Sequence, residues 1–141
     1  MISIVDRLAI EDLYSRYCWA NDGGDADAWA ATFLEDGVYE GLDRTVEGRA
    51  AIRELVASRI ANRANQPIKN PQHWTGNLLL DGDGNSAQGR CYYVRFVQSK
   101  ESGVPKVDTT GWYIDELRKV GGKWGFKKRS AVRDMPLVGA D

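Results

Sequence analysis

The only histidine of this chain, His73, is its first candidate for acid–base chemistry. It lies in the run from Pro71 to Asn77, directly before the apolar residues Leu78 to Leu80. Histidine is the one side chain whose unperturbed pKa lies near neutrality, so it can take up or release a proton close to pH 7. A catalytic histidine needs an acid to orient its ring, and Asp22 is the candidate that the sequence offers.

Asp22 stands in the segment Asn21-Asp22-Gly23-Gly24, where the first helix is expected to end. A carboxylate is unfavourable at this end of a helix, because the helix dipole places partial negative charge there. Such a position suggests another role, and accepting the Nδ1–H of His73 would fix the tautomer of the ring and raise its basicity. The alternative is that Asp22 makes an Asx bond in a turn and that His73 is a partly exposed residue.

The first half of the chain predicts helices. Apolar residues spaced three and four apart, among them Ile10, Leu13 and Tyr17, indicate one buried helix face. Asp25 has the residue type and position of an N-cap for a second, short helix. The helices are expected over Ile4–Ala20, Ala26–Leu34 and Arg49–Ala64, with a short strand at Val38–Glu40.

The second half predicts strands, and a run of helices followed by antiparallel strands is typical of an α+β fold. Gly121-Gly122 is a strong hairpin signal. The segment from Asn65 to Pro71 is interpreted as a polar loop, which places His73 at the start of a strand and at the rim of any cavity. The strands are expected over His73–Leu80, Ser86–Gln98, Val107–Val120 and Lys123–Val132.

Composition narrows the function classes. The chain has 19 Lys and Arg against 20 Asp and Glu, so no overall field attracts nucleic acid or an anionic membrane. Only Lys127 to Arg129 hints at a basic stripe, and such a run is more often a solvated face. No apolar run could span a bilayer and no secretory segment is evident, so a cytoplasmic domain is expected. Cys18 and Cys91 are interpreted as buried thiols.

No metal site is expected. Asp81, Asp83 and Asn85 have the spacing at which a calcium loop begins. The glycine at the sixth position of such a loop and the glutamate at its twelfth are both missing, and a hairpin turn fits the segment better.

The sequence resembles the SnoaL-like branch of the nuclear-transport-factor-2-like superfamily, which includes scytalone dehydratase, hexachlorocyclohexane dehydrochlorinase and polyketide cyclases. The helix-end aspartate and the strand-start histidine are the most specific part of the resemblance. Its other residues are Ile10–Ser15, Ala20, Asn21, Trp29, Phe33, Asp36, Gly48, Asn77, Gly111, Tyr113, Asp115, Glu116, Trp124 and Phe126.

The resemblance implies a single domain over residues 1–141: a cone-shaped α+β barrel, with three N-terminal helices packed in a strongly curved, mixed, mostly antiparallel sheet. It also implies an Asp–His pair, here Asp22 and His73, that removes a proton so that a leaving group can depart. Substrate-binding positions carry over to Tyr17, Tyr39, Tyr93, Arg95, Tyr113 and Arg129. Alternatively, the tyrosines are core aromatics, Arg95 pairs with a surface acid and Arg129 belongs to a solvated strand.

Together these features predict a lyase without a cofactor, performing a dehydratase-like elimination on a hydrophobic, aromatic or polyketide-like small molecule. Phenol donors suit the developing oxyanion of such a substrate, and an inward arginine would favour a carboxylate or phenolate. The alternatives are an isomerase or cyclase, a non-catalytic binding module, and a dioxygenase small subunit on the same scaffold. A homodimer or homotrimer is expected through the outer sheet face, where Tyr92 or Trp112 could make the contact.

Overall fold

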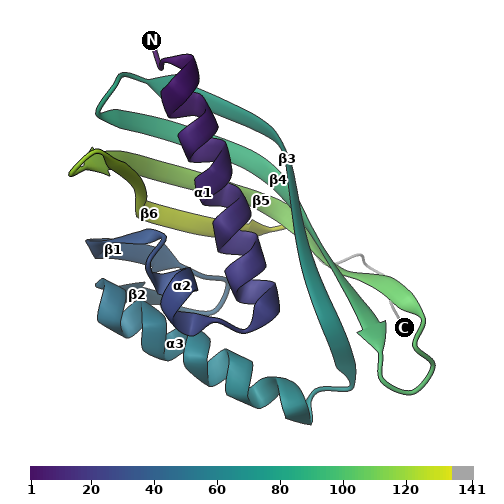
Figure 1. The fold of residues 1–141 in the computed structure, drawn as a ribbon. Helices are drawn as coiled ribbons and strands as arrows, with labels where there is room; N and C mark the ends of the chain where they lie inside the picture. The colour runs from purple at the N-terminus through teal and green to yellow at the C-terminus, as the bar shows by residue number, and fades with distance from the viewer. Residues whose placement is uncertain (135–141) are drawn as a thin grey trace.

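The computed structural model describes residues 1–134, and in it helices pack against one face of a six-stranded sheet (Figure 1). The last seven residues of the predicted 1–141 domain lie outside the described part. The helices are α1 (Ile4–Gly23), α2 (Ala26–Ala30) and α3 (Arg49–Asn62), followed by the 3₁₀ turn η1 (Arg63–Asn65). The strands are β1 (Phe33–Glu40), β2 (Thr45–Glu47), β3 (Ile68–Gly82), β4 (Ser86–Ser99), β5 (Pro105–Val120) and β6 (Lys123–Arg133).

The strand order is β2-β1-β6-β5-β4-β3. β1 pairs with β6 in parallel and the other neighbours pair antiparallel, so the sheet is mixed as predicted. The predicted α+β architecture is therefore confirmed. The sheet is not closed, because β2 and β3 form its two edges, and it curves around α1, which lies across its inner face (Figure 1).

Helix α1 is capped at both ends. Ser3 is the N-cap, and its hydroxyl accepts the backbone N–H of Asp6 at 3.1 Å. Gly24 ends the helix at φ 78°, a conformation that glycine adopts without strain. The helix therefore runs three residues past its predicted end at Ala20, and Asp22 lies inside its last turn.

Helix α2 is shorter than predicted: it ends at Ala30 rather than Leu34. Thr32 hydroxyl donates to the Trp29 carbonyl at 2.6 Å, and the Thr32 carbonyl accepts the backbone N–H of Phe126 at 2.9 Å. Pairing with β6 therefore begins at Phe33, three residues after the end of the helix, and overrides the local helical pattern. The predicted N-cap is confirmed, because the Asp25 carboxylate accepts the Ala28 N–H at 2.9 Å.

Strand β3 begins at Ile68, so the prediction of a loop up to Pro71 was wrong for most of that segment. The pairing with β4 shifts register between Lys69 and Gln72, and Asn70 has a φ of 50°. This irregularity accommodates Pro71, which has no N–H to give to the sheet. His73 consequently lies within the strand, directly opposite Arg95 of β4, rather than at the start of the strand.

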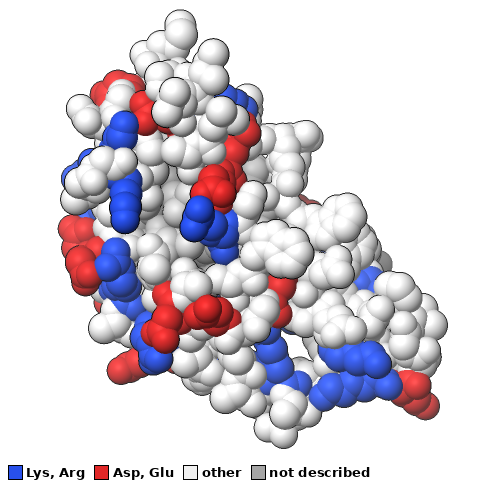
Figure 2. All heavy atoms as spheres, viewed as in Figure 1, with Lys and Arg blue, Asp and Glu red and all other residues white. Residues whose placement is uncertain are grey.

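Positive and negative side chains are intermixed over the face seen in Figure 2, in keeping with the balanced composition. Within residues 1–134 no helix is long and apolar enough to cross a membrane. Cys18 and Cys91 are both buried and unpaired, as predicted.

Candidate active site

The structure brings Asp22 and His73 together across 51 positions of sequence. His73 Nδ1 lies 2.6 Å from Asp22 Oδ1, and the other carboxylate oxygen accepts the backbone N–H of His73 at 2.8 Å. The Asp22 side chain is 17% exposed and the His73 side chain is 12% exposed. Because an ionised carboxylate can only accept, Nδ1 must carry the proton, which leaves Nε2 as the open nitrogen of a neutral ring.

A positively charged side chain at the C-terminal end of α1 offsets the negative charge that Asp22 adds there. Arg63 of η1 donates to the backbone carbonyls of Asn21 and Asp22, at 2.5 Å and 3.2 Å, and to the Asn21 side-chain oxygen at 2.9 Å. A cation at a helix C-terminus is favoured by the helix dipole. Arg63 thus stabilises the helix end that holds the carboxylate beside His73.

His73 lines a cavity of about 550 Å³. This volume is within the range of small-molecule sites. Apolar and aromatic residues form one part of the wall and arginines another. The lining residues are Tyr17, Asn21, Trp29, Tyr39, Leu42, Asp43, Val56, Arg59, Asn62, Arg63, Gln66, Ile68, His73, Tyr93, Arg95, Asp108, Thr109, Tyr113, Ala131 and Arg133.

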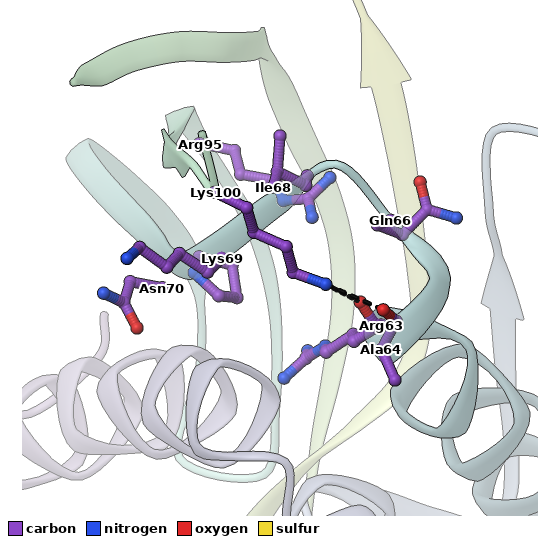
Figure 3. A pocket seen from close by; sticks show the side chains of 9 residues that line it. Arg63, Ala64, Gln66, Ile68, Lys69, Asn70, Arg95 and Lys100 are labelled. Carbon is purple, nitrogen blue, oxygen red and sulfur yellow. Dashed lines mark hydrogen bonds between the residues drawn. The ribbon is translucent and has the colours of Figure 1, made fainter. Parts of the chain in front are cut away.

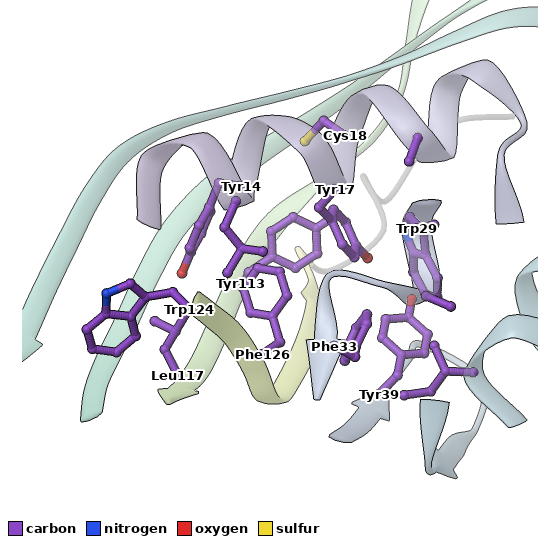
Figure 4. Packing of buried hydrophobic residues seen from close by; sticks show 14 of the residues in the cluster. Tyr14, Tyr17, Cys18, Trp29, Phe33, Tyr39, Tyr113, Leu117, Trp124 and Phe126 are labelled. Atoms are coloured by element: carbon purple, nitrogen blue, oxygen red, sulfur yellow. The ribbon is translucent and has the colours of Figure 1, made fainter. Parts of the chain in front are cut away.

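All four tyrosines predicted as substrate contacts line this cavity: Tyr17, Tyr39, Tyr93 and Tyr113. Tyr93 stacks on Tyr113 with ring centroids 4.6 Å apart, and Tyr17 meets Tyr113 edge-on at 5.7 Å. Burial raises the pKa of Tyr17 and of Tyr113 well above the ordinary value, and burial also raises that of Tyr93. Figure 4 shows the rings of Tyr17, Tyr39 and Tyr113 within the cluster of buried residues that packs between α1 and the sheet. At neutral pH these phenols are donors of hydrogen bonds rather than bases.

The two predicted arginines differ. Arg95 lines the cavity, and it also pairs with Asp108 at 2.9 Å, so the alternative of a pair with an acid is confirmed while its contact with substrate stays a prediction. Arg129 is fully buried and is absent from the cavity wall, contrary to a direct contact with substrate and to a solvated strand. It makes two hydrogen bonds of 2.8 Å to Asp115, because a buried guanidinium needs a carboxylate to offset its desolvation.

Arg129 nevertheless contacts two tyrosines of the cavity wall, Tyr17 and Tyr113, without lining the cavity itself. Its guanidinium carbon lies 4.2 Å from the ring centre of Tyr17 and 4.1 Å from that of Tyr113. This positive charge offsets part of the rise that burial causes in the pKa of both phenols. It also holds the two rings in place through cation–π contacts.

Sequence reasoning missed Arg59 and Arg63 as cavity residues. A signal for them exists in α3 and η1. The buried residues Ile52 and Val56 are followed at helical spacing by Arg59 and Arg63, so two arginines continue the apolar stripe. Charged residues on a buried stripe face either an ion partner or a cavity.

The family follows from comparison with known proteins. A SnoaL-like domain model matches residues 3–130. The chain belongs to the SnoaL-like family. This family includes dehydratases, cyclases and dioxygenase subunits. The comparison with curated proteins found no match.

Solved structures share the SnoaL-like fold. A Mycobacterium tuberculosis protein of unknown function, Rv3472, is 29% identical with a TM-score of 0.83, over 94% of this chain and 74% of that one. A candidate scytalone dehydratase from Novosphingobium aromaticivorans is 23% identical, with a TM-score of 0.78 over 94% of this chain and 86% of that one. LinA is 22% identical, with a TM-score of 0.79 over 96% of this chain and 92% of that one.

The cavity wall also bears on metal chemistry. Within residues 1–134 no group of three or more histidine, cysteine, aspartate or glutamate side chains is arranged to hold a metal ion.

Proposed function

We propose that this SnoaL-like chain is a lyase that needs no cofactor and performs a dehydratase-like elimination on a hydrophobic, aromatic or polyketide-like small molecule. One observation carries the proposal: the His73–Asp22 pair, joined at 2.6 Å, opens onto a cavity of about 550 Å³ whose wall includes four tyrosines and a tryptophan. A fully packed interior, or a histidine out of reach of the carboxylate, would have favoured a non-catalytic scaffold.

His73 is the proposed general base. Nε2 takes a proton from a substrate carbon, the C–H electron pair becomes the new double bond, and the leaving group departs with its own bonding electrons. Asp22 keeps Nδ1 protonated and stabilises the imidazolium that forms, because its carboxylate stays beside the charge. The imidazolium then returns the proton to a departing hydroxide, which leaves as water.

The phenols supply the electrophilic side of the reaction. A proton on carbon becomes acidic when an adjacent carbonyl or phenol oxygen can take up the developing charge. Tyr39, together with Tyr17 or Tyr113, lines the cavity and is proposed to donate hydrogen bonds to that oxygen. Trp29 lies against Tyr17 and Tyr39, with ring centres 5.1 Å and 5.3 Å away, and provides an apolar surface for the substrate ring.

The test is turnover of a panel of hydroxylated cyclic ketones and dihydroaromatics, followed by mass spectrometry for the loss of water. Wild type is compared with His73→Gln and Asp22→Asn, and rates should fall by about 10²–10⁴-fold in both, the usual worth of general acid–base catalysis. Asp12→Asn is the matched control, since Asp12 is an exposed carboxylate of the same helix that pairs with Arg16. This control should keep the wild-type rate.

Undiminished turnover in His73→Gln or Asp22→Asn would remove the pair from the mechanism. A product of unchanged mass would instead assign an isomerisation or cyclisation to the same base. Binding of the panel with no turnover of any member would favour the binding module.

A homodimer or homotrimer remains our prediction. The outer sheet face carries the exposed side chains of Leu79, Tyr92 and Ile114, beside Trp112, around a shallow depression. Exposed apolar clusters of this kind are typical of protein contacts. Light scattering of wild type and of Tyr92→Glu tests it, because a charge on this face should produce monomers.

A further inference from the structure

The cavity beside His73 has an arginine-rich end. Arg59, Arg63 and Arg95 line it, together with the carboxylates of Asp43 and Asp108. Arg59 bonds to Asp43 at 2.7 Å, and Arg95 bonds to Asp108 at 2.9 Å. These two carboxylates therefore pair with two of the four arginines that line the cavity, the other two being Arg63 and Arg133.

Arg63 is one of the two cavity arginines without a carboxylate partner among residues 1–134. Its hydrogen bonds go to the carbonyl oxygens of Asn21 and Asp22 and not to a carboxylate. Across the described part of the chain, residues 1–134, no carboxylate oxygen lies within ion-pair distance of it. Burial, and then the like charge of Arg95, lower the pKa of Arg63, and the nearby Asp22 carboxylate offsets part of this decrease. Two like charges that line the same cavity and affect each other in this way are stabilised by an anion bound beside both.

A hydrogen-bond donor without a partner also indicates an anion site. Arg95 Nε is buried and has no hydrogen-bond partner among residues 1–134. A buried N–H without a partner costs free energy, whereas an anionic oxygen would satisfy it. Arginine is also the residue whose fork of donors matches a carboxylate.

A second hollow of about 290 Å³ extends the positive region. It shares Arg63 and Arg95 with the main cavity and adds Lys69 and Lys100 (Figure 3). Lys100 Nζ donates to the backbone carbonyls of Arg63, at 3.4 Å, and of Ala64, at 2.7 Å. Figure 2 shows Lys and Arg side chains on both sides of a hollow between the end of α3 and the start of β3.

We infer that the substrate of this cavity carries a carboxylate, and that Arg63 and Arg95 bind it while the ring of the substrate lies against Trp29 and the tyrosines. This inference rests on the proposed function, whose substrate class it narrows to an aromatic or alicyclic carboxylic acid. His73 is paired directly with Arg95 across β3 and β4. The reacting carbon therefore lies within a few bonds of the carboxylate.

The test uses two probes of the same shape, naphthalene-2-carboxylate and the neutral naphthalene-2-carboxamide, titrated calorimetrically into the purified protein. Wild type should bind the carboxylate at least about tenfold more tightly, as a charge-assisted pair of hydrogen bonds provides. Arg63→Met and Arg95→Met should each lose most of that preference. Arg53→Met removes an exposed arginine of the same helix α3 and should keep it.

Equal affinity of wild type for the two probes would overturn the inference, and so would an unchanged preference in both Arg63→Met and Arg95→Met. Because Arg63 also caps α1, thermal melting of each variant verifies folding, and Arg95→Met gives an answer that does not depend on that cap. His73→Gln separates this inference from the proposed function. Its carboxylate preference should remain even where turnover is lost, so the two ideas fail independently.

Discussion

The Asp22 carboxylate binds His73 at two points, one on the ring and one on the backbone. Oδ1 lies 2.6 Å from Nδ1, and Oδ2 accepts the N–H of the same residue at 2.8 Å. One acid therefore fixes both the ring orientation and the position of the strand that carries the ring. This double attachment ties the last turn of α1 to the middle of β3, and it orients the base before any substrate is bound.

The first prediction concerns the tautomer of His73. The neutral ring should carry its proton on Nδ1, because the carboxylate opposite can only accept. Nitrogen-15 NMR of the labelled protein measures this directly, since the chain has a single histidine. Asp22→Asn should mix the two tautomers, because an amide can donate as well as accept. A wild-type ring protonated on Nε2, or no change in Asp22→Asn, would contradict the pairing.

Much of the fold could be predicted from local patterns. The spacing of apolar residues and caps such as Asp25 predict the helices. Gly121 and Gly122, whose φ values are 56° and 79°, predict the β5–β6 hairpin. The element boundaries that were predicted wrongly depend on pairing with strands that are distant in the sequence. Phe33 joins β1 because Phe126 lies beside it, and Ile68 joins β3 because Ser99 pairs with it. Neither partner is close in sequence.

The candidate site divides in the same way. Asp22 and His73 could be paired from the sequence because Asp22 lies at an unfavourable place for an acid, the chain has a single histidine, and the family resemblance implies an Asp–His pair. Arg129 could not be placed, because its burial depends on Asp115 and on rings contributed by α1, β5 and β6. Arg63 depends on where η1 approaches the end of α1, and local spacing does not fix that approach.

The second prediction concerns the buried Asp115–Arg129 pair. Both side chains are fully buried, and Tyr14 also donates a hydrogen bond to Asp115. Arg129→Met should lower the free energy of unfolding by about 3–5 kcal/mol, because it leaves a buried carboxylate without its cation. Urea denaturation measures the loss.

A triple variant, Tyr14→Phe with Asp115→Leu and Arg129→Met, should recover much of that free energy, since it leaves no buried polar group unpaired. Lys128→Met is the neighbouring control. Its partly exposed pair with Glu40 should contribute only about 0–1 kcal/mol. Equal losses in Arg129→Met and Lys128→Met would show that the buried pair carries no special weight.

The third prediction concerns Gly89 of β4. A Cβ at this position would lie 2.4 Å from the Tyr14 hydroxyl and 3.2 Å from Leu117 Cδ1. Tyr14 cannot easily give way, because its hydroxyl is bound to Asp115. Gly89→Ala should therefore destabilise the protein by about 1–3 kcal/mol. Gly76→Ala on β3, where no atom lies within 4 Å, should change stability by less than about 0.5 kcal/mol.

The fourth prediction concerns acid stability. Hydrogen bonds from Lys119, Trp124 and Ser3 lower the pKa of Asp6 to about 2, against an ordinary value of 3.8. A carboxyl group with a depressed pKa stabilises the folded state fully above its unfolded pKa, and this contribution disappears as the pH falls through the folded value. Wild type should therefore exceed Asp6→Asn in stability by a constant margin above about pH 5, and the margin should shrink towards pH 2.

Urea midpoints of wild type and Asp6→Asn between about pH 6 and pH 2.5 measure this margin, because the other carboxyl groups titrate in both proteins and cancel in the difference. Asp12→Asn provides the comparison, since Asp12 is exposed and bound only to Arg16 of its own helix. A margin for Asp6 that stays constant down to pH 2.5 would place its pKa outside the expected interval. A margin that shrinks for Asp6 and is small throughout for Asp12 would identify the hydrogen bonds that Asp6 accepts from Lys119 and Trp124 as a source of the acid-labile stability.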